Sequence, residues 1–275
     1  TGGGKSLCYQ VPAIVRRDAG HGVTVVVSPL IALMHDQVGA LHEAGVEAAF
    51  LNSTLDWQQT LHVERRLSRG EITLLYAAPE RVTTERFIGL LDELHARGQL
   101  SLFAIDEAHC VSQWGHDFRP DYLYVSRFIR RTQGAQPSPV FGFTATAKPD
   151  VVADISAHFE RRLGVALARL EGGVSRNNLD YEVRAVPPQA KYAETLRLLE
   201  DALREEGGAI VFCARQKTVE EIAKFLQDGG LPCAYFHGGM LPADKRRVQE
   251  AFLAGQLRVI AATNAFGMGV DKPDV

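Results

Sequence analysis

The chain has 275 residues, of which 46% are hydrophobic and 23% charged, a balance typical of a globular protein with enough chain for two cores. The pI of about 6.3 argues against a general nucleic-acid binder, for which a value above about 9 is usual. Any nucleic acid must therefore be held by a few placed groups. No apolar run of about 18 residues occurs, so no membrane-spanning segment is expected. The four cysteines form no C-x-x-C pair, which supports neither a zinc ribbon nor a disulfide framework.

In the first part of the chain, short apolar runs alternate with longer amphipathic ones. Strands are predicted at Val23–Val27, Ala48–Leu51, Thr73–Ala77, Leu100–Ile105 and Val140–Phe143. Helices are predicted near Leu30–Leu41, Asp56–Arg69, Thr84–His95, Asp121–Arg131 and Pro149–Phe159. Apolar strands separated by helices indicate a parallel sheet that is covered on both faces.

Turn and linker residues fill Glu171–Asn178, and we expect a domain boundary there. The alternation then restarts. Strands are predicted at Tyr181–Val186, Ala209–Cys213, Cys233–His237 and Leu257–Ala262, and helices at Lys191–Arg204, Lys217–Gln227 and Pro242–Leu253. The expected fold class is α/β, with tandem domains at residues 1–174 and 175–275. Both ends are expected to be truncated, because no strand precedes the first motif and the second unit stops abruptly at Val275.

The first motif, Thr1–Ser6, reads TGGGKS and matches the last six positions of G-x-x-x-x-G-K-[ST]. In that motif the backbone amides hold phosphates, the lysine reaches the outer phosphates and the hydroxyl binds Mg²⁺. The leading glycine of the motif falls before Thr1, so a glycine-rich turn without function is the alternative. Pro12 predicts a kink or an early end of the helix that follows.

Two carboxylates, Asp106 and Glu107, follow the predicted buried strand Leu100–Ile105. Such a pair at a strand end completes the metal and water shell that a phosphate-binding loop requires. We assign Asp106 to Mg²⁺ and Glu107 to positioning the attacking water. By itself an Asp-Glu pair is more often a solvated strand end, but the glycine-rich loop upstream favours a nucleotide site.

Directly after the carboxylates, Trp114, Phe118 and Arg119 lie within a short segment that is predicted to be a loop. The two aromatic side chains are suited to stacking on bases, and the arginine to contacting a phosphate or a base face. A small satellite core is the alternative reading. The residues at 115–117, Gly-His-Asp, favour an exposed loop.

Together these motifs resemble those of superfamily 2 helicases, and in particular the RecQ family of DNA helicases. The superfamily motifs I, II and III correspond to Thr1–Ser6, Asp106–His109 and Thr144–Thr146. The RecQ-like features are Leu7–Pro12, motif Ia at Ser28–Gln37 and the aromatic-rich loop His109–Asp121. Motifs Ib, IV and V correspond to Ala78–Arg81, Ile210–Arg215 and Ala262–Val275. The resemblance covers essentially the whole chain, in the family's order.

The resemblance implies two RecA-like domains that hold ATP and Mg²⁺ between them and bind single-stranded DNA across both. It also implies 3′ to 5′ movement, unwinding of forked DNA in repair or recombination, and a location in the bacterial cytoplasm near the nucleoid or in a eukaryotic nucleus. The implied catalytic residues are Lys5, Asp106, Glu107, His109 and Gln113, with Ser6 and Asp106 on the metal. The implied ATP contacts are Thr1, Gly2, Gly3, Gly4, Lys5, Ser6, Gly267, Gly269 and Asp271. The implied nucleic-acid contacts are Ser28, Arg81, Trp114, Phe118, Arg119, Arg215, Thr263 and Asn264, and Thr144 and Thr146 are the implied coupling residues.

Some family features fall outside these residues: the upstream glutamine motif, motif VI with its arginine finger, and the zinc-binding and winged-helix segments. Three alternatives stay open. The first is a superfamily 2 motor that acts on RNA or translocates without unwinding. The second is a nucleic-acid-binding fragment without turnover, because an arginine finger is worth about 10³ to 10⁵ in rate; we expect the isolated chain to show little DNA-stimulated hydrolysis. The third is a small-molecule kinase or another phosphate-loop enzyme.

Overall fold

The computed structural model divides the chain into two units, Thr1–Glu171 and Gly172–Val275. It describes residues 4–113, 118–131, 138–145, 148–164, 166–170, 179–204, 206–266, 272 and 274–275. None of the helices in this described part combines the length and the hydropathy that a transmembrane span requires.

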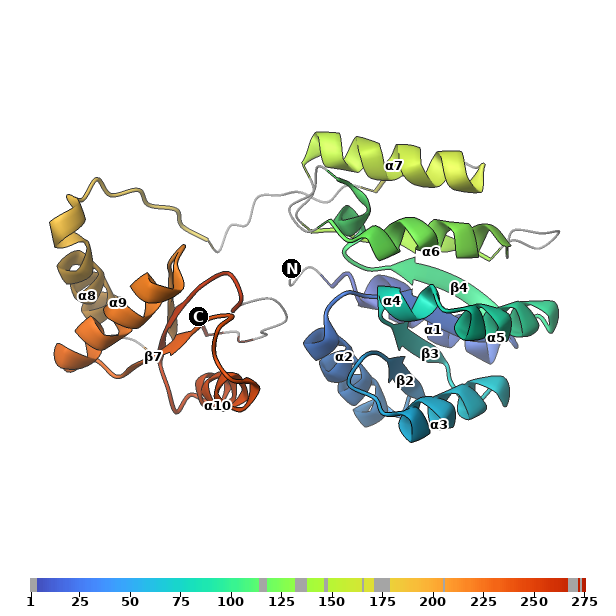
Figure 1. Cartoon of the computed structure of the whole chain (residues 1–275), viewed down its shortest axis with the longest axis horizontal. Coiled ribbons are helices and arrows are strands. Elements are labelled where there is room, and N and C mark those ends of the chain that lie inside the picture. The colour runs from blue at the N-terminus through green and yellow to red at the C-terminus, as the bar shows by residue number, and fades with distance from the viewer. Residues whose placement is uncertain are drawn as a thin grey trace. The chain divides into compact units, whose positions relative to one another are not determined.

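A five-stranded parallel sheet forms the centre of the first unit, in the order β2-β3-β1-β4-β5 (Figure 1). Its strands are β1 (Val23–Val27), β2 (Ala48–Leu51), β3 (Leu74–Ala77), β4 (Leu100–Ile105) and β5 (Val140–Gly142). Every residue of β1, β3 and β4 is buried, as expected for parallel strands covered on both faces. The strands predicted for this part of the chain are therefore confirmed to within one residue at each end.

Helices cover both faces of this sheet. The core on one face is built by α1 (Leu7–Asp18) and α2 (Ile31–Glu43). The core on the other face is built by α3 (Trp57–Ser68), α5 (Glu85–Ala96), α6 (Pro120–Arg131) and α7 (Pro149–Leu163). The short helix α4 (Pro79–Val82) was not predicted, because four residues are too few to show a helical period.

The expectation of a break at Pro12 is wrong in one respect. Helix α1 continues through Pro12 to Asp18 and does not end there. A proline inside a helix removes one backbone hydrogen bond. Here the burial of Tyr9 and Ala13 in the core on either side of Pro12 offsets that loss.

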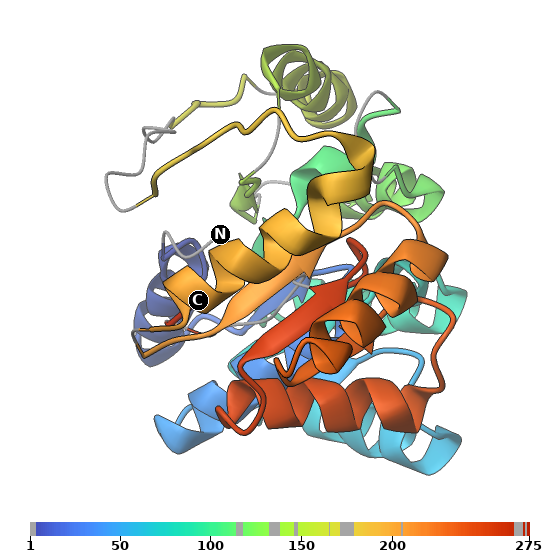
Figure 2. The ribbon, with the colours of Figure 1, turned by 90° about the vertical axis from the view of Figure 1, so that its left-hand side faces the viewer.

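The second unit contains a three-stranded parallel sheet in the order β6-β8-β7 (Figure 2). Its strands are β6 (Ala209–Phe212), β7 (Cys233–Phe236) and β8 (Val259–Ala262). Helices α8 (Lys191–Ala202) and α9 (Gln216–Asp228) pack against one core cluster, and α10 (Pro242–Leu253) packs against another. The predicted helices and these three predicted strands are confirmed.

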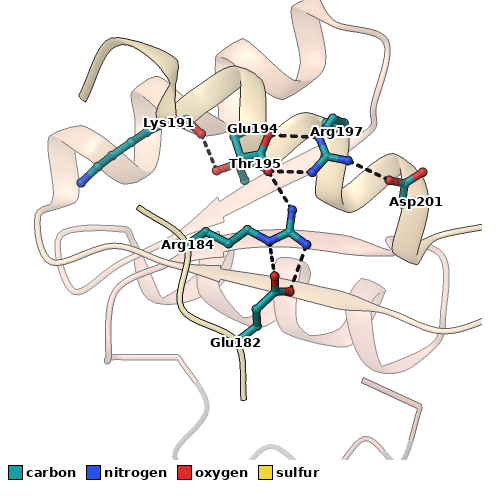
Figure 3. Close-up of polar contacts among 7 residues, drawn as sticks. All are labelled: Glu182, Arg184, Lys191, Glu194, Thr195, Arg197 and Asp201. Atoms are coloured by element: carbon teal, nitrogen blue, oxygen red, sulfur yellow. Dashed lines mark hydrogen bonds and ion pairs between the residues drawn. The ribbon is translucent and has the colours of Figure 1, made fainter. Parts of the chain in front are cut away.

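The strand predicted at Tyr181–Val186 is wrong. This segment forms no strand, and Tyr181 and Val183 are 88% and 98% exposed. The alternation of apolar and polar residues in this segment resembles that of a half-buried strand, but within the described residues the segment pairs with no other strand. It is held by ion pairs instead, since Arg184 contacts Glu182 at 2.7 Å and Glu194 of α8 at 2.9 Å (Figure 3).

The packing of α7 on α6 predicts a pH effect on the stability of the first unit. Burial, and then the charges of Arg162 and Arg161, lower the pKa of His158, whose Nε2 lies 2.9 Å from the Ser126 hydroxyl. As the pH falls through about 6.5, the unfolded chain takes up a proton that the folded chain resists, so the free energy of unfolding decreases.

We therefore expect His158→Gln to reduce the loss of stability between pH 7.5 and 5.5, measured by urea unfolding at each pH. His62→Gln, on the exposed side of α3, is the matched control. An unchanged pH dependence in His158→Gln would contradict the prediction.

Candidate functional site

The start of α1 carries the last residues of the first motif. Gly4 has φ of 71°, a left-handed conformation that glycine adopts without strain, and its carbonyl accepts from the Leu7 N–H at 3.0 Å. Lys5 and Ser6 follow at the helix N-terminus, and both side chains are half-buried. Free N–H groups and the helix dipole make this end of a helix attractive to anions.

Asp106 lies at the carboxyl end of β4, beside the end of β1. Its N–H donates to the Val27 carbonyl at 2.8 Å, and its Oδ1 accepts from the Glu107 N–H at 3.0 Å. Burial raises the pKa of Asp106, and the adjacent charge of Glu107 raises it further. The charge of Lys5 acts in the opposite direction, so the lysine of the first motif and the aspartate of the second lie near each other.

Glu107 has φ of 47° and ψ of 47°, the only positive φ of a non-glycine residue in the described part of the chain. This conformation is costly for glutamate and, where it occurs, often marks a functional site. It places Oε2 of Glu107 3.2 Å from Nδ1 of His109. The hydrogen bond from His109, and then the charge of Lys5, lower the pKa of Glu107, so this carboxylate stays ionised while its neighbour resists ionisation.

The buried imidazole of His109 connects Glu107 to the segment after β5. Its Nδ1 lies 3.1 Å from Oγ1 of Thr144. Because a carboxylate only accepts, Nδ1 carries a hydrogen that is shared between Glu107 and Thr144. A backbone bond of 2.8 Å from the Ala108 N–H to the Phe143 carbonyl holds the same two segments together. Residues predicted separately, in motifs II and III, are therefore in direct contact.

Three tyrosines that were assigned no functional role from the sequence lie near Asp106, and one of them, Tyr9, falls in the RecQ-like segment Leu7–Pro12. The Tyr122 hydroxyl donates to the Asp106 carbonyl at 3.0 Å. Tyr9 and Tyr76 belong to the core cluster on the other face of the sheet, where their rings pack edge to face and Gln10 donates to the Tyr76 hydroxyl at 3.0 Å. Burial raises the pKa of Tyr9 and Tyr76, so both hydroxyls stay protonated. No local pattern distinguishes such tyrosines from ordinary core residues.

The predicted nucleic-acid residues of the first unit are partly brought together. Phe118 and Arg119 are half-buried, and Nη1 of Arg119 donates to the Pro29 carbonyl at 3.3 Å, which joins the aromatic-rich loop to motif Ia. Gln113 is exposed, whereas Ser28 is fully buried at the end of β1. Arg81 donates through Nη2 to the Asn52 carbonyl at 3.1 Å.

In the second unit, Arg215 is exposed and directly precedes α9. Thr263 is buried after β8, where its N–H donates to the Phe236 carbonyl at 3.1 Å, and Asn264 is exposed beside it. The remaining predicted site residues lie outside the described residues: Thr1, Gly2, Gly3, Trp114, Thr146, Gly267, Gly269 and Asp271.

The described residues contain no group of three or more His, Cys, Asp or Glu that is able to hold a metal. Mg²⁺ does not require one, because it binds one or two carboxylates and completes its octahedral shell with water and phosphate oxygens. The hydroxyl of Ser6 and the carboxylate of Asp106 are hard oxygen donors of this kind. The donor set therefore fits Mg²⁺ together with a bound phosphate.

The end of the TGGGKS motif at a helix N-terminus, an Asp-Glu pair at a strand end and parallel sheets covered by helices are features of the class of RecA-like nucleotide-binding proteins. Comparison with family models matches residues 1–155 to the DEAD/DEAH box helicase domain and residues 190–275 to the helicase conserved C-terminal domain. The chain belongs to the DEAD/DEAH box helicase family.

Among curated proteins, the chain is 39% identical over 276 residues to the ATP-dependent DNA helicase RecQ of Haemophilus influenzae. It is also 39% identical over 276 residues to the ATP-dependent helicase SGS1 of Saccharomyces cerevisiae. Both alignments cover 100% of this chain but only 42% and 18% of the relatives, so the chain spans less than half of their length. The similarity to RecQ helicases predicted from the motifs is confirmed.

A solved structure of the Mycobacterium smegmatis helicase Lhr, bound to single-stranded DNA and AMP-PNP, superimposes with a TM-score of 0.64. The match covers 100% of this chain and 38% of that one, at 18% sequence identity. This likeness confirms the predicted fold class of RecA-like helicase domains.

Proposed function

We propose that this chain is the core of an ATP-dependent DNA helicase of the RecQ type, which couples ATP hydrolysis to 3′ to 5′ movement along single-stranded DNA and to unwinding of forked DNA. The observation that carries the proposal is the chain of contacts from Glu107 through His109 to Thr144, close to the charge of Lys5. Relatives of this kind occur in bacteria and eukaryotes, which supports a location in the cytoplasm or the nucleus.

Each residue of the nucleotide site has a proposed role. Lys5 and the N–H groups at the start of α1 bind the outer phosphates of ATP, and Ser6 and Asp106 hold Mg²⁺. The metal neutralises phosphate charge when it is bound. Glu107 orients the attacking water and accepts its proton, a task suited to a carboxylate that stays ionised.

The contacts of His109 support a role in coupling. A change in the position of Glu107 during hydrolysis alters the hydrogen bond that it shares through Nδ1 of His109. The hydrogen bond of His109 with Thr144 changes as a result. Gln113 is proposed to carry the same signal to Trp114 and Phe118, which stack on bases, while Thr146 extends the relay beyond Thr144.

The remaining assignments complete the proposal. In the first domain, residues 1–174, Ser28, Arg81 and Arg119 are proposed to contact DNA. In the second domain, residues 175–275, we propose DNA contacts at Arg215, Thr263 and Asn264. The proposed ATP contacts that complete the site are Thr1, Gly2, Gly3, Gly4, Gly267, Gly269 and Asp271.

We expect single-stranded DNA to stimulate ATP hydrolysis by the complete protein more strongly than RNA of the same length and sequence. Trp114→Ala should lose most of this stimulation, because stacking contributes about 1 to 3 kcal/mol per base, while nucleotide binding survives. Steady-state ATPase assays with each nucleic acid and a nucleotide-binding assay measure both effects. Tyr124→Ala, which removes an exposed ring on α6, is the control.

Equal stimulation by RNA and DNA would instead support a superfamily 2 motor without RecQ-type preference. Unchanged stimulation in Trp114→Ala would remove the role of the aromatic-rich loop. Turnover that no nucleic acid affects would support the small-molecule alternative.

A further inference from the structure

An exposed tryptophan on the first unit carries an arginine on its ring. Trp57, at the start of α3, is 62% exposed, and the guanidinium carbon of Arg86 lies 4.5 Å from the centre of its ring. A guanidinium over an indole is a favourable cation–π arrangement, which orients the ring. So large an exposed aromatic surface, held in one orientation, is characteristic of a binding surface.

The arginine is itself fixed from below. Its Nε donates to both carboxylate oxygens of Glu64, at 3.1 Å and 2.9 Å, and its Nη2 forms a further bond to Glu64. The Glu64 side chain is 11% exposed and the Arg86 side chain 48%, so the carboxylate of this charge-assisted pair is largely buried while the guanidinium is half-exposed. The carboxylate of Glu64 balances the charge of Arg86. The indole therefore packs against a fixed ion pair with little net charge.

The start of α3 is rigid for a second reason. Asp56 accepts the Gln59 N–H at 2.8 Å, and the Gln59 side chain accepts the Asp56 N–H at 3.0 Å, which forms a complete capping box. The Asp56 carboxylate is therefore committed to the helix end, where the dipole stabilises it. Trp57 follows immediately and is held at its backbone as well as at its ring.

A cavity of about 320 Å³ opens beside the indole. Its walls include Leu51, Leu55, Thr60, Thr84 and Arg81 together with Trp57. Because Leu51 ends β2 and Arg81 follows β3, the cavity lies at the carboxyl ends of the parallel strands, the same edge of the sheet as Asp106 and Glu107. Ligands of open α/β sheets bind outside this edge.

Four charged side chains, those of Asp56, Glu64, Arg86 and Arg81, line the cavity, and Arg81 has a defined position. Its guanidinium is tethered to the Asn52 carbonyl at 3.1 Å, and Asn52 is fully buried with its Oδ1 accepting the Thr54 N–H at 2.9 Å. The charges of Asp56, Glu64 and Arg86 are engaged with one another or with the helix end. A neutral planar group fits the cavity beside Trp57, with one negative charge of the same ligand on Arg81.

We propose that Trp57 and this cavity form a base-stacking subsite, which takes one unpaired base of a single DNA strand whose phosphate lies on Arg81. The subsite rests on the proposed function and extends it, since it is formed by residues other than those of the aromatic-rich loop. A surface for an apolar segment of a protein partner is the competing use, and it predicts no response to DNA.

Fluorescence provides a direct test, because the chain contains two tryptophans, Trp57 and Trp114. In Trp114→Phe, which keeps a ring at that position, Trp57 is the only emitter. We expect a single-stranded oligothymidylate to quench its emission and an abasic oligonucleotide of equal length and charge to leave it unchanged. Binding of the oligothymidylate, shown by anisotropy, without quenching would overturn the proposal.

Affinity provides an independent test. We expect Trp57→Ala to weaken binding of single-stranded DNA by about 5-fold to 150-fold, the range for loss of one stacked base, and Trp57→Phe to keep most of the affinity. Tyr124→Ala is the matched control. Tyr124 is 48% exposed, and the guanidinium carbon of Arg127 lies 5.0 Å from the centre of its ring, a second arginine–aromatic pair among the described residues of the first unit.

Different results would contradict the base-stacking subsite and the helicase function. Normal DNA affinity in Trp57→Ala, with DNA-stimulated ATP hydrolysis retained, would refute the subsite and leave the proposed function intact. Absence of DNA binding in the unmutated chain and of stimulation in the complete protein would refute the proposed function itself.

Discussion

Glu107→Gln is expected to lower DNA-stimulated ATP hydrolysis by the complete protein by about 10² to 10⁴-fold, the usual contribution of a positioned general base. Glutamine keeps the shape of the side chain and still accepts the hydrogen bond from His109, which lies 3.2 Å from the present carboxylate. It does not accept a proton from water. ATP affinity should stay close to that of the unmutated protein, because Lys5 and Ser6 are unchanged.

Steady-state hydrolysis and equilibrium binding of a fluorescent ATP analogue separate these two effects. Glu93→Gln is a suitable control, since Glu93 is exposed on α5 and pairs with Arg97 one turn away at 3.4 Å. Unchanged turnover in Glu107→Gln would show that Glu107 does not take part in ATP hydrolysis.

The second large effect concerns stability rather than chemistry. A Cβ on Gly22 would lie 1.6 Å from the carbonyl oxygen of Gln99, which also accepts the Val23 N–H at 2.8 Å. The Gln99 atoms in the way belong to the backbone, so they cannot move aside by a change of rotamer. The ends of β1 and β4 must therefore separate at this point. Overpacking costs about 1 to 3 kcal/mol and a lost hydrogen bond about 1 kcal/mol more.

We therefore expect Gly22→Ala to destabilise the first unit by about 2 to 4 kcal/mol, a fall in its Tm of roughly 4 to 16 °C. Calorimetry is the appropriate measurement, because the transition of the second unit should not move. Gly39→Ala is the matched control with the opposite sign. Gly39 lies on the exposed side of α2 with no atom near a Cβ, and alanine there should stabilise by about 0.5 to 1 kcal/mol. Equal stability of Gly22→Ala and the unmutated chain would contradict the prediction.

Most secondary structure followed from the sequence, because parallel strands buried on both faces are continuous apolar runs. Val23–Val27 and Leu100–Ile105 were predicted with the bounds that the structure has. The segment Tyr181–Val186 was the exception, because alternating apolar and polar side chains show only that a segment is able to form a strand. A strand also needs a neighbour that supplies hydrogen bonds, and no local sequence encodes that neighbour.

The candidate site was predictable as a set of residues and less so as an arrangement. Lys5, Asp106 and Glu107 were identified because phosphate and Mg²⁺ chemistry restricts the residue types at fixed spacings. The left-handed backbone of Glu107 and the buried contact of His109 with Thr144 were not visible in any spacing. Both depend on how β4 and β5 meet.

By itself the sequence determined the two α/β units, the helicase motifs and their order, since each depends on local periodicity or on residue types at short range. Tertiary structure alone decided that Arg86 lies over Trp57 and that Glu64 pairs with Arg86. These side chains come from α3 and α5, which approach one another only because both cover the same face of one sheet. Contacts between distant segments depend on how the helices pack on the sheet. Local sequence patterns do not encode that packing.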